Sequence, residues 1–278
     1  MRIAAKSGYT IIEVLIVLAI STSLLFAAIA VFKGQQDETE FTQVVQDLNS
    51  RVINYANQVS AGTFPDSEQY TCNGSTPRPT LALASGNLGG RQGCIFLGRA
   101  IQFSVDTGKV NVYTVLGKQT DASGDPVTDI ANASAEPSIR TDSCNASISD
   151  CWVLTDSFDL ASSVRIKSAV LTDTLGNTPT GWMAGIYTAL DQNSGPTTGI
   201  LQQMLWGYQL AGNAGAFSTG GNGVKGCVEN TGQAGGCTNM QIVKWDVCIQ
   251  NPNGNHTFLM TIQGSTTGVS TSLTDNGC

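Results

Sequence analysis

The first thirty-two residues hold the longest apolar stretch of the chain. From Ile11 to Phe32 there is a single charged side chain, Glu13, and Lys33 follows directly. These 22 residues would span roughly 33 Å as an α-helix, about the hydrocarbon thickness of a bilayer. The pattern therefore predicts a membrane-spanning helix. An ionised Glu13 inside it costs on the order of a few kcal/mol unless paired, so we expect this carboxylate to have a partner.

Beyond Lys33 the apolar residues recur every three or four positions, which is the period of an amphipathic helix. The opposite face is polar. We expect one continuous helix up to about Ala61, ended by Gly62 and Pro65, with Gly34 as a hinge and the apolar stripe docked on a β-sheet. A soluble coiled coil is the alternative. The stripe is Phe41, Val44, Val45, Leu48, Val52, Tyr55 and Val59, and the polar face carries Asp37, Glu38, Glu40, Asp47 and Arg51.

After a Pro-, Gly- and Ser-rich connector, short runs rich in β-branched and aromatic residues predict strands, and the C-terminal segment predicts a hairpin with its turn at 251–255. Polar loops are expected at 119–150 and 191–239, the second around an apolar patch, 200–210, that fits either a helix or a strand. The fold class is thus α+β, a long N-terminal helix on an antiparallel sheet. The strand signals lie at 95–97, 100–105, 110–115, 163–171, 182–190, 240–249, 257–262 and 269–273.

Composition places the part after the helix outside the cytosol. Only 13% of residues are charged, glycine is abundant, and the net charge is −7. This mixture is typical of a loop-rich extracytoplasmic β protein rather than a cytosolic enzyme. A basic leader and an apolar run also suggest a signal peptide or a plain signal anchor. The run is too long for the first, and the second does not explain Glu13.

The N-terminal junction carries a specific motif. Lys6-Ser7-Gly8 is followed by Tyr9-Thr10-Ile11-Ile12-Glu13-Val14-Leu15. This resembles the cleavage and methylation motif of type IV prepilins and pseudopilins. The resemblance implies cleavage after Gly8 by a prepilin peptidase, N-methylation of Tyr9, and assembly through Thr10 and Glu13, the glutamate pairing with the terminal amine of a neighbouring subunit.

Two departures from the family pattern are visible. Tyr9 stands where the family more often has Phe, and the mid-helix proline of many members is missing, since the first proline is Pro65. The C-terminal hairpin is similar to the globular domain of GspH/FimT-type minor pilins, over about a quarter of the chain. The first departure should be harmless, and the second leaves open whether the helix melts locally on assembly.

The resemblance implies a domain plan and a function. Residues 1–8 would be the leader, 9–62 the anchor and assembly helix, and 63–278 the extracytoplasmic domain. The protein would be a non-enzymatic filament subunit for surface attachment or motility, held in the cytoplasmic membrane before assembly and on the cell surface afterwards. Its partners would be itself, other pilins, the peptidase, and an assembly ATPase with its platform protein. A type II secretion pseudopilin and a non-polymerising anchored adhesin are the alternatives.

Eight cysteines follow the apolar helix, and they predict disulfides formed after export. Neighbour pairing, 72 with 94, 144 with 151, 227 with 237 and 248 with 278, closes the shortest loops. Metal binding is disfavoured because no Cys-x-x-Cys occurs and His256 is the only histidine, and no cofactor is expected. The cysteines are Cys72, Cys94, Cys144, Cys151, Cys227, Cys237, Cys248 and Cys278.

Other chemistry is weakly indicated. No Gly-x-Ser-x-Gly motif accompanies His256, so a hydrolase is not expected. The acidic loop Asp121, Asp125 and Asp129 lacks EF-hand spacing and is interpreted as solvated. No Lys or Arg follows Lys244, so a basic DNA-binding tail is absent. We expect Trp182, Trp206 and Trp245 in the core, and nucleic acid is not an expected partner.

Overall fold

The computed structural model describes most of the long helix and most of the strands. Contacts divide the chain into two units, 1–43 and 44–278, which are treated separately below. All structural statements concern the described residues, which are 10–62, 70–73, 80–83, 94–104, 108–118, 138–139, 154–161, 164–189, 202–210, 227–228, 237–265 and 268–278.

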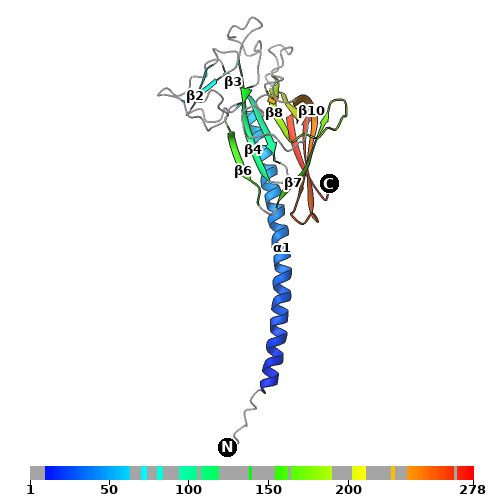
Figure 1. Ribbon diagram of the computed structural model, residues 1–278. Coiled ribbons are helices and arrows are strands. Elements are labelled where there is room, and N and C mark those ends of the chain that lie inside the picture. Colours follow the sequence, from blue (N-terminus) through cyan, green and yellow to red (C-terminus); the bar gives the residue numbers. More distant parts are fainter. Residues whose placement is uncertain are drawn as a thin grey trace, which may run out of the picture. The chain divides into compact units, whose positions relative to one another are not determined.

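A single helix, α1 (Ile11–Ser60), contains both the apolar and the amphipathic stretches. It continues through Gly34 without a break, at the position where the sequence predicted a hinge (Figure 1). The helix ends at Ser60, close to the expected Ala61, and Gly62 follows with a φ of 60°, the left-handed conformation that glycine adopts at helix C-termini. The N–H of Gly62 donates to the carbonyl of Val59 at 3.1 Å.

A curled, ten-stranded antiparallel sheet forms the body of the second unit, which confirms the α+β class (Figure 1). Its order is β12-β11-β10-β9-β8-β3-β4-β5, with β6 paired to β4 and β7 to β10, and β1 and β2 pair apart from it. The strands are β1 (Tyr70–Asn73), β2 (Thr80–Leu83), β3 (Cys94–Phe103), β4 (Lys109–Lys118), β5 (Ser138–Ile139), β6 (Leu154–Asp159), β7 (Arg165–Asp173), β8 (Met183–Ala189), β9 (Gln202–Leu210), β10 (Cys237–Gln250), β11 (Thr257–Ser265) and β12 (Gly268–Asp275).

Strand β10 organises the C-terminal part of this sheet. Ile242 pairs with Leu205 of β9 and with Asp173 of β7, so β9 and β7 lie on opposite edges of β10. Lys244 pairs with β7 and with Gln263 of β11. Hence β9 and β11 follow one another along one edge, and a single long strand connects the two parts of the sheet.

The second half of α1 packs on the sheet through its apolar stripe. Val45, Leu48, Val52, Tyr55 and Val59 are buried, as their spacing predicted. Arg51 on the flank of this stripe pairs with Asp47 at 2.8 Å and lies over the Phe158 ring of β6. The predicted docking of the helix on a sheet is therefore confirmed.

Polar side chains from the sheet bond to the last turns of α1. The buried Gln203 of β9 donates from Nε2 to the Ala56 carbonyl at 2.5 Å and accepts from the N–H of Val269 in β12 at 2.8 Å. The buried Arg99 of β3 donates to Gln58 at 2.8 Å and to Thr114 at 2.7 Å. These bonds give the helix end a defined position on the sheet, which apolar packing alone specifies less well.

Small residues let the sheet close around large ones. A side chain at Gly207 would overlap both Leu171 and Ile242, so the fully buried Leu171 uses the space that this glycine leaves. Trp245 is buried, donates from Nε1 to the Gly181 carbonyl at 3.0 Å and stacks obliquely on Phe103. Trp182 is also buried, as expected, whereas Trp206 is only half-buried.

The structure adds strands that the sequence pattern did not indicate. β1 and β2 lie in the predicted connector, β5 lies in the predicted polar loop 119–150, and β6 was not predicted. Residues 202–210 of the undecided apolar patch at 200–210 form the strand β9. β6 contains only Leu154 and Phe158 as large apolar residues, and its pairing with β4 decides its conformation.

We expect Gln203→Leu to lower the free energy of unfolding by about 1–3 kcal/mol, because it leaves the Ala56 carbonyl and the Val269 N–H without their partner. Chemical denaturation of the full chain in detergent measures this. Gln263→Leu, an exposed position on β11, is the matched control and should change stability by less than about 0.5 kcal/mol. Equal effects of the two substitutions would contradict the role given to Gln203.

Candidate functional site: the start of the long helix

Thr10 caps the N-terminus of α1. Its Oγ1 accepts the N–H of Glu13 at 3.3 Å, and its carbonyl accepts the N–H of Val14 at 3.2 Å. Thr followed three residues later by Glu is the spacing of a capping box, and a carboxylate in the first helical turn also interacts favourably with the helix dipole. Thr10 and Glu13, the two predicted assembly residues, are thus joined by a local interaction.

The Thr-x-x-Glu spacing of Thr10 and Glu13 in the sequence is the signal for this cap, whereas the prepilin resemblance implied only pairing between subunits for these two residues. The structure places Glu13 on the surface of the helix. A carboxylate there is available to a second molecule while it also supports the start of its own helix. Gly8 and Tyr9, the predicted cleavage and methylation positions, lie outside the described residues.

The helix surface around Glu13 is apolar on every side. Ile11–Ile29 is the one helical segment among the described residues that is long and apolar enough to cross a membrane. Its large side chains are exposed, with Ile11 at 81%, Ile12 at 70% and Phe26 at 72%. Elsewhere in the described part of the chain, the exposed large apolar side chains are limited to Ile53, Leu175 and Val243.

Two of the hydroxyl groups within this apolar segment are satisfied by the helix itself. Thr22 donates to the carbonyls of Leu18 and Ala19, and Ser23 donates to Ala19, all at 2.9 Å. Such bonds lower the polar cost of placing the segment in lipid or in a bundle of apolar helices. It has the character of a transmembrane helix, which could serve as an anchor or as a signal.

Two disulfides close segments of the sheet unit, and both match the predicted neighbour pairing. Cys227 bonds Cys237 at the start of β10, and Cys248 of β10 bonds Cys278 at the end of the chain. The C-terminal tail is further held by the N–H of Asn276, which donates to the Thr257 carbonyl at 2.8 Å. Cys72 and Cys94 lie in β1 and β3, but their side chains are outside what the structure describes, and so are Cys144 and Cys151, so these two predicted pairs stay predictions.

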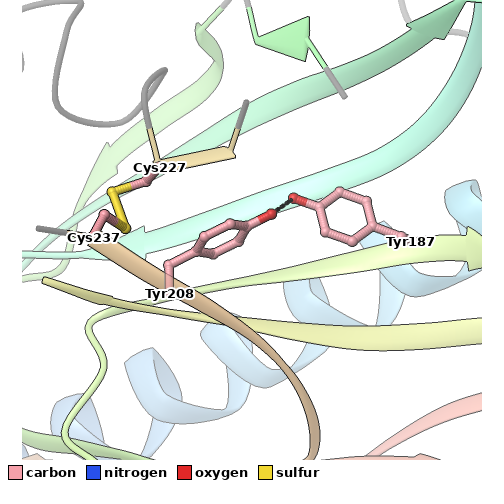
Figure 2. The surroundings of a disulfide bond; sticks show 4 residues. All are labelled: Tyr187, Tyr208, Cys227 and Cys237. Carbon is pink, nitrogen blue, oxygen red and sulfur yellow. Dashed lines mark hydrogen bonds between the residues drawn. A yellow bond between two sulfur atoms is a disulfide. The ribbon is translucent and has the colours of Figure 1, made fainter. Parts of the chain in front are cut away.

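A pair of tyrosines lies in the sheet next to the Cys227–Cys237 bond. Figure 2 shows Tyr187 of β8 and Tyr208 of β9 with their hydroxyls directed at each other, at 2.5 Å. Burial raises the pKa of both phenols above the usual value, and the proximity of Tyr187 raises that of Tyr208 further. Both groups therefore remain neutral in the folded protein, where they serve as core hydrogen-bonding groups rather than as acids.

A third buried phenol, that of Tyr113, belongs to a polar cluster between β3 and β4. Tyr113 donates to Oε1 of Gln102 at 2.8 Å, and Asn111 donates to the same oxygen at 3.3 Å. Burial raises the pKa of Tyr113 to about 12, although its hydrogen bond with Asn111 opposes the shift. The cluster is fixed inside the sheet and offers no open site.

The remaining chemical candidates do not come together as a site. His256 pairs with Asp275 at 2.8 Å and stacks near Phe258, which ties the turn before β11 to the end of β12. Within the described ranges no group of three or more His, Cys, Asp or Glu side chains could hold a metal ion. Asp121, Asp125 and Asp129 lie outside those ranges.

Comparisons with known proteins identify no relative: no protein-family model, no curated protein and no solved structure matches the chain. The architecture is nevertheless informative. An N-terminal apolar helix followed by a disulfide-bonded β-sheet unit is compatible with a pilin.

We expect stability to be independent of the Tyr113 phenol below about pH 10, where it is neutral in both the folded and the unfolded chain. Above that pH the phenol ionises in the unfolded chain before it ionises in the folded chain. The free energy of unfolding therefore falls as the pH rises from about 10 towards the folded-state pKa of about 12. Denaturation midpoints measured from pH 8 to 12 should fall, and Tyr113→Phe should make the fall shallower. An identical fall in the variant would contradict the raised pKa.

Proposed function

We propose that this protein is the structural subunit of a type IV pilus-like filament, processed after Gly8 and polymerised through the first half of α1. The observation that supports this most is the exposure of a predominantly apolar helix surface whose only carboxylate, Glu13, lies one turn from the proposed new N-terminus. A filament of packed helices would cover that surface and give the carboxylate a cationic partner.

The chemistry of assembly follows from these positions. Before assembly the membrane covers Ile11–Ile29. In a filament, neighbouring helices replace the lipid. Glu13 would pair with the methylated amine of Tyr9 on another subunit, because two buried charges are tolerated as a pair and the pairing fixes the axial register. The peptidase, an assembly ATPase and a platform protein are the partners that this route requires.

The sheet unit would form the outer surface of such a filament. It has a low charge content, and the chain is acidic overall. Its disulfides would keep it folded outside the cell. Surface attachment or motility is the role we propose, and the long loops 119–150 and 191–239 are where a ligand preference would lie.

An anchored adhesin that never polymerises would use the same helix as a plain membrane anchor. Mass spectrometry of filaments sheared from the producing cell separates the two proposals. We expect a peptide that starts at methylated Tyr9. If that peptide comes from the dominant filament protein, the chain is a major pilin, and at trace level it is a minor subunit. Protein that starts at Met1 and remains wholly in the membrane fraction would overturn the filament proposal.

Glu13 provides the second test. We expect Glu13→Val to be cleaved and membrane-bound but incorporated into filaments at less than about a tenth of the wild-type level, since loss of a buried charge pair exceeds 1.4 kcal/mol. Incorporation is measured by immunoblotting of sheared filaments against the membrane fraction.

Asp37→Val is the matched control, because it removes the same charge from the same helix outside the apolar segment. It should incorporate normally. Normal incorporation of Glu13→Val would contradict the pairing between subunits; the bond to Thr10 Oγ1 comes from the main-chain N–H of residue 13 and is kept in this variant.

A further inference from the structure

The last strand of the chain, β12, is the edge of the ten-stranded sheet. It pairs with β11 along its full length, from Phe258 opposite Asp275 to Ser265 opposite Gly268, without a register shift. In the described part of the chain no other strand pairs with it. An edge strand of this kind presents unpaired N–H and C=O groups to any chain of matching geometry.

The hydrogen bonds around β12 show which of its main-chain N–H and C=O groups are directed away from β11. The N–H of Val269 donates to the Gln203 side chain rather than to β11. Because direction alternates along an antiparallel ladder, the main-chain groups of Thr271, Leu273 and Asp275 share this outward direction. Consistently, the N–H of Asn276 points back to Thr257 of β11.

Protein edge strands are usually protected by lysine, proline, a bulge or a covering element. β12 has the sequence Gly-Val-Ser-Thr-Ser-Leu-Thr-Asp, which contains no lysine or proline, and its ladder has no bulge. Gln203 protects only its first residues. The single charge, Asp275, is at the far end and is paired with His256 at 2.8 Å.

The strand is also complementary to itself. In an antiparallel pair of two copies with Ser272 on the two-fold axis, Thr271 lies opposite Leu273 of the second copy, and Val269 lies opposite Asp275. No two like charges face each other in this register. The side chains of Val269, Thr271 and Leu273 are each half-buried in one chain, so the second copy would cover more of them.

The strand is held in place before any partner arrives. The Cys248–Cys278 disulfide and the bond from Asn276 to Thr257 fix its end, and Gln203 fixes its beginning. A partner would therefore not have to supply the free energy needed to order this edge.

We propose that β12 is a self-association strand, which pairs edge to edge with β12 of a second copy of this chain. The contact is two-fold, so it closes on itself and makes dimers; it does not propagate a filament. It would link two subunits whether or not they polymerise through α1, and it is therefore independent of the function proposed above.

Disulfide trapping of the full chain in detergent tests this proposal. Ser272 lies in a non-hydrogen-bonded pair on the two-fold axis, where Cα atoms are about 4.5 Å apart, within the range for a disulfide. Under mild oxidation we expect Ser272→Cys to give a covalent dimer as the main species. Leu175→Cys is the control for random collision, since this turn residue is 86% exposed and lies off the edge.

A second pair of variants tests the hydrogen bonds. In the Ser272→Cys background, Thr271→Pro removes an outward N–H without removing a bond to β11, and it should abolish the trapped dimer. Thr271→Ala retains that N–H and should trap normally. Ser272→Cys that traps no more dimer than Leu175→Cys would overturn the proposal, as would full trapping of a folded Thr271→Pro variant.

Discussion

The constraint on which this molecule depends is that the surface of α1 from Ile11 to Ile29 cannot remain in water. Burying each of its large side chains contributes about 1.5–3 kcal/mol, and the helix itself accepts the hydroxyl hydrogen bonds of Thr22 and Ser23. The sheet unit has the opposite requirement, because its exposed side chains are mostly polar. The chain is therefore built for two environments at once. Glu13 is the one group of the apolar segment that does not fit lipid.

The sheet unit supports this arrangement by fixing the other end of the helix. The side chains of the apolar stripe from Val45 to Val59 are buried against the sheet unit. Gln203 gives the end of the helix a more specific position, because its buried side chain, on β9, forms hydrogen bonds with both α1 and the edge strand β12. A load on the last turns of the helix would thus reach both β9 and β12 through Gln203.

The long periodic stretch of the helix and the C-terminal hairpin could be predicted from the sequence, because both are local patterns. Val45, Leu48 and Val52 fall on one helix face whatever surrounds them. β6 could not be predicted, since Leu154 and Phe158 become a strand only when β4 is beside them. The pairing of β10 with β7, β9 and β11 depends equally on distant segments. At the candidate site, Thr10 and Glu13 were found from their motif, but their local bond became evident only in the structure.

The C-terminal disulfide has a mechanical consequence. Cys248 and Cys278 are 30 residues apart in sequence, and β11 and β12 both lie between them. Fully extended, such a segment would lengthen by roughly 100 Å. With the bond closed, tension applied across the two cysteines cannot draw it out, and a protease cut in the turn between β10 and β11 leaves both pieces attached. Under tension the chain would therefore yield first elsewhere, and its last two strands would be retained.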